Sequence, residues 1–273
     1  MLIDYHMHTR LTDGVGEPSD YARVAVERGL DEIGCSDHAP LASHDSKIGT
    51  GGATDWHMQK SDSSASAGLE TYVGWVREAQ KKFPMLPIKL GLEVDFIPGC
   101  EDWVRELAAM YPWDFFLGSV HYIGEFPVDR SAKDWESEDV DTRWREYFDL
   151  WKKAALSRLF DSLAHPDLPK KFNFRPKADF TAVYEDALRA VAEAGVAIEV
   201  SSAGLRKPCH EIYPSAAFLK IARRFDVPIT LGSDAHAPQE VGQDFGKVLA
   251  LARSCGYDKI SRFTLRRREL VKL

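Results

Sequence analysis

Short apolar runs alternate with longer amphipathic segments along almost the whole chain. The apolar runs predict strands, whereas segments whose apolar residues recur every three or four positions predict helices. Within residues 141–156, for example, Trp144, Phe148 and Trp151 recur at i, i+4 and i+7, which predicts the buried side of a helix. The predicted strands cover residues 2–6, 31–36, 88–94, 115–121, 159–164, 196–200 and 227–232, and the predicted helices cover residues 18–28, 69–83, 100–110, 141–156, 180–194, 215–224 and 239–254.

These alternations give seven strand–helix units and predict an α/β fold with a parallel sheet and helical crossovers. Seven units in about 255 residues fit a closed, TIM-like (β/α)7 barrel better than an open sheet. The sequence shows no internal repeat and no dividing linker, so we expect one domain over residues 1–273. Two segments with little periodicity, 39–66 and 125–138, follow predicted strands, and we expect them at the carboxyl rim, where barrel active sites are built.

The composition limits the cellular location and the binding partners expected for this protein. The 273 residues carry 35 Lys and Arg against 42 Asp and Glu, and a net charge of −7 argues against nucleic acid or anionic membranes as partners. The basic stretch Arg266–Arg268 within residues 260–273 is typical of a solvated surface. Four widely spaced cysteines, no apolar run of about 20 residues and no signal-peptide pattern at the first residues predict a cytoplasmic protein with reduced thiols.

Histidines and carboxylates stand at the ends of successive predicted strands. His6 and His8 follow the first strand, and their i, i+2 spacing puts both rings on one side of it. Because parallel strands of a barrel end at one rim, all of these side chains are expected to meet there. The nine histidines of the chain include six in such positions, namely His6, His8, His38, His121, His165 and His236, and the accompanying carboxylates are Glu93 and Asp234.

So many ionisable groups buried together need a compensating charge, because the desolvation of each uncompensated buried charge costs roughly several kcal/mol. Divalent metals provide it, and imidazole with carboxylate suits Zn, Mn or Fe. One catalytic zinc needs three protein ligands, so eight or nine ligands predict two or three metal ions. The sequence has neither a Gly-rich phosphate loop nor a serine nucleophile elbow, which disfavours those hydrolase classes.

Six motifs resemble those of the PHP (polymerase and histidinol phosphatase) superfamily, in the family's order and over nearly the whole chain. They are Asp4-Tyr5-His6-Met7-His8-Thr9, Ser36-Asp37-His38-Ala39-Pro40, Gly91-Leu92-Glu93-Val94-Asp95, His121-Tyr122, His165-Pro166-Asp167 and Gly232-Ser233-Asp234-Ala235-His236. Three further features resemble the branch of monofunctional histidinol-phosphate phosphatases: Trp56-x-Met58, Gly204-Leu205-Arg206-Lys207 and the basic tail ending Val271-Lys272-Leu273. The resemblance implies a distorted seven-stranded barrel with three divalent metal ions, Zn, Mn or Fe.

The resemblance also implies the ligands. Eight positions match directly, and they are His6, His8, His38, Glu93, His121, His165, Asp234 and His236. At the ninth, where many relatives have histidine, this chain offers Asp13. Glu93 and Asp234 are expected to bridge metals. We expect Asp13, His38 and His236 on one ion, and His121 and His165 on another.

The activity implied by the resemblance is the hydrolysis of L-histidinol phosphate to L-histidinol and phosphate in histidine biosynthesis, by a metal-activated hydroxide that attacks phosphorus. Asp234 and His236 could also move protons. Arg206 is the predicted phosphate clamp, because guanidinium pairs bidentately with phosphate oxygens, and Lys207 and Lys170 are the next choices. The partner is thus a small phosphate ester, bound by a monomer or homodimer.

Several neighbours of the motifs have expected roles around the site. Asp37 is expected to orient a ligand, and Asp95 to hold either a ligand or the amine of the substrate. Tyr122 and Trp56 could stack on an imidazole ring, and Tyr122 is a predicted substrate contact. The remaining histidines, His44, His57 and His210, fall outside the motifs and are expected to be solvent-exposed bystanders.

Three alternatives remain open from the sequence. A phosphoesterase of this family could act on nucleotides or nucleic acid ends, although the acidic charge disfavours this. A non-catalytic metal-binding module of the same family would be expected to lack ligands, whereas every position here is filled. A barrel amidohydrolase also uses His-x-His and a late Asp, but it needs a lysine ligand mid-chain, for which there is no matching position.

Overall fold

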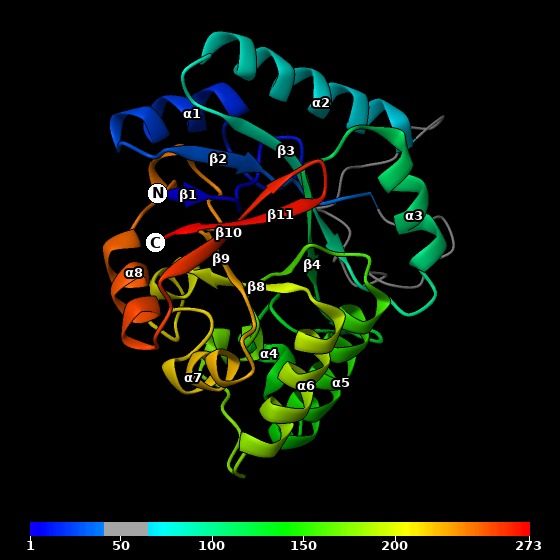
Figure 1. Cartoon of the computed structure of the whole chain (residues 1–273). Coiled ribbons are helices and arrows are strands. Elements are labelled where there is room, and N and C mark those ends of the chain that lie inside the picture. Colours follow the sequence, from blue (N-terminus) through cyan, green and yellow to red (C-terminus); the bar gives the residue numbers. More distant parts are fainter. Residues whose placement is uncertain (41–64) are drawn as a thin grey trace.

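Seven parallel strands form one sheet in the order β1-β2-β3-β4-β7-β8-β9, in a computed structural model that describes residues 1–40 and 65–273 (Figure 1). Each predicted strand is present, although β1 and β7 are shorter than expected. The bounds are β1 Ile3–Asp4, β2 Glu32–Cys35, β3 Ile88–Asp95, β4 Phe115–Ser119, β7 Ser162–Leu163, β8 Ala197–Ser201 and β9 Ile229–Gly232.

The last strand returns to the first. Tyr5 N donates to Leu231 O at 3.0 Å, and Ala235 N donates to His6 O at 3.0 Å, so hydrogen bonds join the ends of β9 and β1. The sheet is therefore a nearly closed seven-stranded barrel, which confirms the predicted fold class. Closure brings the carboxyl ends of all seven strands around one opening.

Helices cover the outside of the barrel. They follow the strands as the apolar spacing predicts, with Trp144, Phe148 and Trp151 all buried on the inner side of α5. Asp139 caps that helix, accepting a hydrogen bond from Thr142 N at 2.8 Å. The bounds of the main helices are α1 Pro18–Glu27, α2 Ala65–Lys82, α3 Glu101–Met110, α5 Val140–Ser157, α6 Thr181–Ala194, α7 Ala216–Arg224 and α8 Phe245–Ser254.

Two predicted segments differ from the structure. The helix expected over residues 239–254 is divided into a short 3-10 helix, Pro238–Glu240, and α8, because Gly242 and Asp244 adopt positive φ angles of 65° and 59° that interrupt a right-handed helix. The segment 125–138, expected to be irregular, contains β6 (Phe126–Pro127), which pairs with β5 (Tyr122–Ile123), and the short helix α4 (Ala132–Trp135). Of the other irregular segment, residues 41–64 lie outside the described residues.

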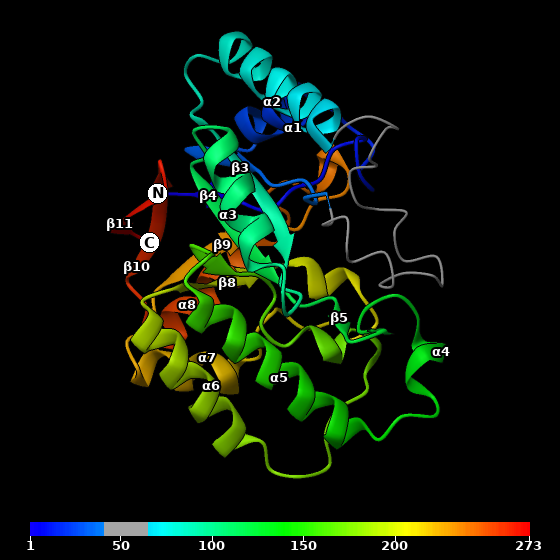
Figure 2. The same cartoon turned by 90° about the vertical axis from the view of Figure 1, so that its right-hand side faces the viewer.

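A C-terminal hairpin lies on the opposite side of the barrel from β5 and α4 (Figure 2). It consists of β10 (Lys259–Thr264) and β11 (Arg267–Lys272), and its Arg267 and Arg268 are exposed. Phe263 packs near Tyr5 and Phe115, with ring centroids 5.8 and 6.3 Å away, so apolar side chains fill the amino end of the barrel. Within the described residues, no helix is long and apolar enough to cross a membrane.

Candidate metal centre

The six motif histidines meet at the carboxyl end of the barrel, each delivered by a different strand end except for His6 and His8, which share one. Five of these rings are buried, with exposed fractions of 6% or less. His236, on the turn after β9, is more open. Neighbouring rings lie close together, and the centroids of His8 and His38 are 4.4 Å apart while those of His8 and His236 are 4.5 Å apart. The structure thus brings together the residues that the strand-end pattern singled out.

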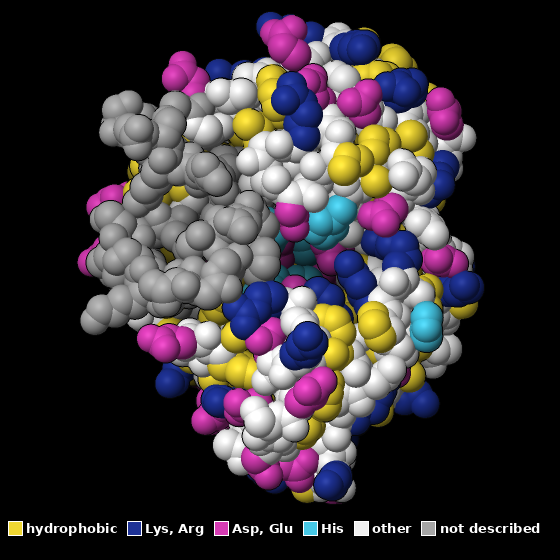
Figure 3. Space-filling view, turned by 180° about the vertical axis from the view of Figure 1, so that it is seen from behind, with side chains coloured by type: hydrophobic (Ala, Val, Ile, Leu, Met, Phe, Trp, Pro, Cys, Tyr) yellow, Lys and Arg dark blue, Asp and Glu magenta, His cyan; other side chains and the backbone are white. Residues whose placement is uncertain are grey.

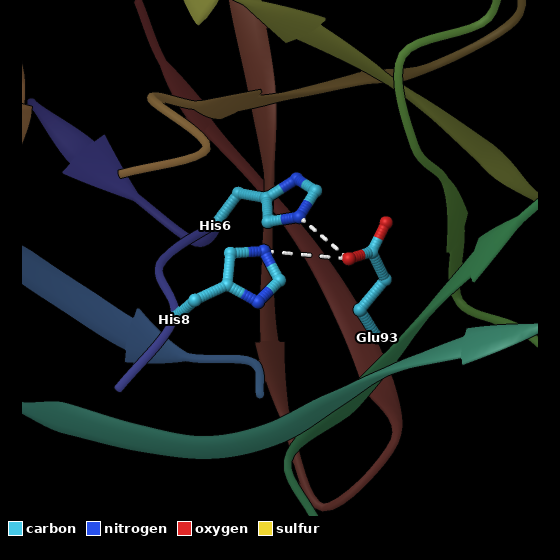
Figure 4. A group of neighbouring side chains, drawn as sticks. All are labelled: His6, His8 and Glu93. Carbon is cyan, nitrogen blue, oxygen red and sulfur yellow. Dashed lines mark ion pairs between the residues drawn. The ribbon is translucent and has the colours of Figure 1, made fainter. Parts of the chain in front are cut away.

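Glu93 of β3 reaches into the middle of this group. Its Oε2 lies 3.2 Å from Nε2 of His6 and 3.3 Å from Nε2 of His8 (Figure 4). The same oxygen lies 3.2 Å from Nδ1 of His38. One oxygen of the carboxylate therefore faces three imidazole nitrogens.

The second oxygen of Glu93 faces a different pair of rings. Oε1 lies 3.0 Å from Nε2 of His165 and 3.5 Å from Nε2 of His121, and it accepts a hydrogen bond from the Ser119 hydroxyl. A carboxylate whose two oxygens face separate sets of ligand nitrogens has the arrangement of a group that bridges two cations.

Two aspartates complete the open side of the group. Asp234 Oδ1 lies 3.3 Å from Nε2 of His8 and 3.5 Å from Nδ1 of His236. Asp13 Oδ2 lies 3.0 Å from Nε2 of His236 and 3.7 Å from Nε2 of His38. Asp13 therefore contacts the rings of both His38 and His236, but these three residues are not one of the described groups whose ligand atoms all lie within 4.8 Å of one another, so their assignment to one ion stays a prediction. Asp234 holds a φ of 50°, a backbone conformation that non-glycine residues seldom adopt and that is concentrated at functional sites.

The loop that carries Asp13 is fixed by Asp37. The Asp37 carboxylate accepts hydrogen bonds from Thr9 N and Thr9 Oγ1, both at 2.5 Å, and from Thr12 Oγ1 at 2.8 Å. Gly14 is needed in the same turn, because a Cβ there would lie 1.9 Å from the carbonyl oxygen of His8. Asp37 thus orients a candidate ligand, although it acts through the loop rather than through a ring.

Buried carboxylates also orient two of the rings from behind. Glu199 Oε1 lies 2.7 Å from Nδ1 of His6, and Glu199 Oε2 accepts a hydrogen bond from His165 N at 2.8 Å. Asp95 Oδ1 lies 2.6 Å from Nδ1 of His121. A proton on each Nδ1 satisfies these contacts and leaves Nε2 of His6 and His121 directed at Glu93, the arrangement that carboxylate–histidine–metal triads use.

The charges of the group hold its carboxylates ionised. Burial raises the pKa of Glu93, but His6, His38 and His121 outweigh this and hold that pKa well below its usual value. Burial likewise lowers the pKa of His121, whereas Asp95 and Glu93 raise it to about 10. For His8, burial and the neighbouring rings of His38 and His236 lower the pKa to about 4, which favours a neutral, ligating imidazole.

Metal ions fit this donor set. Four ring nitrogens are shielded from water and have no hydrogen-bond partner among the described residues: Nε2 of His6, both nitrogens of His8 and Nδ1 of His165. Buried imidazole nitrogens without a hydrogen-bond partner have lone pairs that a metal ion would satisfy. Four groups have ligand atoms within 4.8 Å of one another: His6, His8 and Glu93; His8, Asp13 and His38; His8, Asp234 and His236; and His38, Glu93 and His121.

A cavity of about 300 Å³ opens beside these residues. In the view from behind, histidine and acidic side chains lie in a recess with Lys and Arg side chains at its rim (Figure 3). Three cationic residues line the cavity, namely Arg130, Lys171 and Lys207, together with Asp129, Leu168 and Tyr213 beside the candidate ligands.

Lys207 and Arg206, both predicted to bind substrate, differ in position. Lys207 lines the cavity, and no described residue forms a hydrogen bond or ion pair with its ammonium group. Arg206 is absent from the cavity lining. Its Nη2 donates to Ser233 O at 2.7 Å and to Asp234 O at 3.1 Å, so the guanidinium supports the turn that carries Asp234.

Other predicted substrate contacts also lie behind the cavity wall. Asp95 contacts the ring of His121, which is the first of its two expected roles. Tyr122 is buried in β5 and does not line the cavity. Lys170 is buried and donates to Asp167 and to Ile212 O at 2.8 and 2.7 Å.

Three charged residues of the cavity lining have no role in the sequence-based prediction: Asp129, Arg130 and Lys171. The position of segment 125–138 after a strand end was the available signal for the first two. For Lys171 there was none, because only the turn after His165 decides which of two adjacent lysines faces the cavity. Trp56, Met58, His44 and His57 lie outside the described residues, and His210 is exposed.

Fold and site together define a barrel with a buried histidine–carboxylate centre able to hold metal ions. The sequence profile of the PHP domain matches residues 4–203, and the profile described as PHP-associated matches residues 218–245. The chain belongs to the PHP domain family.

Relatives within the family share a common description. A probable histidinol-phosphatase of Deinococcus radiodurans is 35% identical over 260 residues, which cover 93% of this chain and 94% of the relative. A histidinol-phosphatase of Bacillus subtilis is 26% identical and covers 88% of this chain and 95% of its own. The crystal structure of histidinol phosphate phosphatase from Lactococcus lactis, complexed with Zn, L-histidinol and phosphate, matches the fold with a TM-score of 0.81 at 21% identity and covers 98% of both chains.

Proposed function

We propose that this protein is a metal-dependent phosphomonoesterase that hydrolyses L-histidinol phosphate to L-histidinol and phosphate. The observation that carries the proposal is the position of Glu93, whose two oxygens face separate sets of imidazole nitrogens beside a cavity lined by cationic side chains. The relatives from Deinococcus radiodurans and Bacillus subtilis support the choice of substrate. The first is described as a probable histidinol-phosphatase and the second as a histidinol-phosphatase, and this chain matches almost the full length of each.

The proposed centre holds three divalent ions, Zn, Mn or Fe. Their ligands would be His6, His8, Asp13, His38, Glu93, His121, His165, Asp234 and His236. When bound, such ions lower the pKa of water toward 7 and offset the charge of phosphoryl oxygens. Glu93 is suited to bridging because its oxygens point in two directions, and Asp234 because its Oδ1 faces His8 and His236 at once.

The side chains around the centre have distinct tasks in this proposal. Lys207 donates hydrogen bonds to the phosphoryl group, because its ammonium faces the cavity without a partner among the described residues. Lys171 and Arg130 add positive charge at the same cavity. His236 is 32% exposed beside Asp13 and is placed to exchange a proton with the leaving alcohol or with solvent. Arg206 acts indirectly, by holding the Asp234 turn.

Two alternative functions can be distinguished from the proposed one. A nucleotide or a nucleic acid end could reach the same centre, but a chain of net charge −7 offers little attraction to a polyanion. A non-catalytic module is disfavoured because the ligand positions are filled and lie together. We retain one domain over residues 1–273, a cytoplasmic location and a monomer or homodimer as predictions.

Phosphate release provides the test. The purified protein, stripped with a chelator and reloaded with Mn²⁺ or Zn²⁺, is assayed on L-histidinol phosphate and on nucleoside monophosphates. We expect metal-dependent turnover of histidinol phosphate with kcat/KM at least 100-fold above that for the nucleotides. Rapid nucleotide hydrolysis without turnover of histidinol phosphate would refute the substrate, and metal analysis that finds at most one ion per chain would refute the trinuclear centre.

A further inference from the structure

Asp129 lies in the wall of the cavity but belongs to none of the four groups of described side chains that could hold a metal ion. It follows β6, and the adjacent Val128 N donates to His121 O at 2.8 Å, which fixes this turn beside the metal centre. The Asp129 side chain keeps 19% of its surface exposed. Part of the Asp129 side chain is therefore open to the cavity.

One side of this carboxylate is already occupied. Lys171 Nζ donates to Asp129 Oδ2 at 3.0 Å and to Asp129 O at 2.6 Å. The other oxygen, Oδ1, has no hydrogen-bond partner among the described residues and is shielded from bulk water by its neighbours. An acceptor withdrawn from water without a donor costs free energy, so a donor from a bound ligand would stabilise the carboxylate once rotation of the side chain turns this oxygen toward the cavity.

The chemistry of the donor follows from the charges of the lining. Phosphate oxygens carry negative charge and accept hydrogen bonds, so they are repelled by a carboxylate and attracted to Lys207 and to metal ions. A protonated amine is the opposite, since it carries positive charge and three N–H donors. L-Histidinol phosphate contains both groups on adjacent carbon atoms, and a cavity of about 300 Å³ must accommodate them together.

We infer that Asp129 selects 2-amino alcohol phosphates by accepting a hydrogen bond from the protonated amine while the phosphoryl group lies at the metal centre. The inference rests on the proposed function and specifies which part of the substrate this residue recognises. It gives Asp129 a role that Asp95, committed to the ring of His121, does not fill. A purely structural Asp129 would instead serve only to position Lys171.

Two matched pairs of substrates test the inference on the full-length, metal-loaded protein. The first pair is L-histidinol phosphate and its deamino analogue, 3-(imidazol-4-yl)propyl phosphate, and the second is phosphoethanolamine and ethyl phosphate. Asp129→Asn keeps the size of the side chain but removes its charge, and Lys171→Met removes the partner of the carboxylate as a matched control. Metal content is measured for each variant so that only proteins with equal loading are compared.

We expect Asp129→Asn to lower kcat/KM for the amine-bearing member of each pair about 10- to 100-fold, mainly through KM, as the loss of a charged hydrogen bond implies. The amine-free member should change by less than about threefold. Lys171→Met should leave the preference for the amine intact. An equal loss on both members of a pair, or no preference for the amine in the unmodified protein, would overturn the inference.

The same data separate this inference from the proposed substrate. If the unmodified protein ignores L-histidinol phosphate but prefers phosphoethanolamine over ethyl phosphate, and Asp129→Asn abolishes that preference, the proposed substrate is wrong and the selection of the amine by Asp129 stands.

Discussion

Nδ1 of His6 lies 2.7 Å from Oε1 of Glu199, at the buried base of the candidate metal centre. Glu199 comes from β8 and His6 from the end of β1, and both side chains are almost completely inaccessible to water, with 1% and 0% exposed. The contact fixes the ring so that Nε2 faces Glu93 at 3.2 Å. A residue that binds no metal in the proposal thus decides where one of the ligand nitrogens points.

Replacing Glu199 should therefore weaken metal binding. Glu199→Gln keeps the shape of the side chain but removes the charge that stabilises the protonated Nδ1, and we expect metal affinity to fall about 10- to 100-fold, as for other groups behind metal-ligating histidines. Competition with a chromophoric chelator measures this. Glu193→Gln, at an exposed position of α6, is the matched control and should leave the affinity unchanged.

The approach of Glu199 to His6 also requires a glycine. A Cβ at Gly232 would lie 1.8 Å from Glu199 Oε1 and 2.7 Å from Cβ of His6. We expect Gly232→Ala to lower the free energy of unfolding by about 2–4 kcal/mol and to reduce metal content, because the site must open to admit a methyl group. Gly246→Ala in α8, where a Cβ meets nothing within 4 Å, should be neutral or stabilising in the same denaturation experiment.

Lys207 and Arg206 should give different kinetic defects. Lys207→Met removes a cation that faces the cavity, and we expect KM for the phosphate ester to rise about tenfold or more with a smaller change in kcat. Arg206→Ala leaves the carbonyl oxygens of Ser233 and Asp234 without their donor, so we expect lower metal occupancy and a lower kcat. Steady-state kinetics with metal analysis distinguish the two, and an Arg206→Ala protein with full metal loading and raised KM would restore Arg206 as a direct phosphate clamp.

Metal loading should release protons at neutral pH. Burial lowers the pKa of His236, but Asp234 and Asp13 raise it to about 9, and the pKa of His121 is raised to about 10, so both rings are protonated in the metal-free centre at pH 7. A ligating nitrogen must lose its proton, so apparent metal affinity should increase as pH rises from 6 toward 9. Burial lowers the pKa of His6 as well, but Glu199 and Glu93 outweigh this and raise it well above its usual value. Calorimetric titrations in two buffers of different ionisation enthalpy should therefore report a net release of about two to three protons. Identical heats in both buffers would contradict this.

Removing the central carboxylate should damage the whole centre. Glu93 is the residue whose two oxygens face five histidine rings, and Glu93→Gln halves its capacity to bind cations while keeping its volume. We expect the bound metal to fall by at least one ion per chain and kcat to fall about 1,000-fold or more. Mass spectrometry of the metal content and phosphate-release kinetics check this, and a variant with unchanged metal content would exclude bridging by Glu93.

The strand-end pattern anticipated much of the centre because local sequence rules decide it. In a parallel barrel every strand ends at the same rim, so a histidine after β4 and one after β7 become neighbours whatever the details of packing. The i, i+2 spacing of His6 and His8 places both rings on one side of the chain, because successive side chains in an extended segment point to opposite sides. Asp13 was harder to assign from spacing, since its position depends on a turn held by Asp37 and Gly14.

Residues that contact the centre from outside the motifs were not predictable in this way. Glu199 lies within the strand β8, where a single carboxylate among apolar neighbours gives no sign of its partner. Arg206 and Lys207 are adjacent in sequence, yet one points at backbone carbonyls and the other at the cavity, because the 3-10 turn Ala203–Arg206 separates their directions. Lys170 and Lys171 are likewise adjacent in sequence, yet Lys170 is buried against Asp167 whereas Lys171 lines the cavity.

The sequence by itself determined the alternation of strands and helices, the barrel class and the meeting of histidines with Glu93 and Asp234, since these follow from periodicity and from the shared direction of parallel strands. Only the tertiary structure decided how the hairpin β10–β11 packs against the amino end of the barrel and which cations face the cavity. It also decided that Asp129 carries an oxygen beside the metal centre that has no hydrogen-bond partner within residues 1–40 and 65–273. These features depend on turns and on contacts between segments distant in sequence, for which local residue patterns carry no signal.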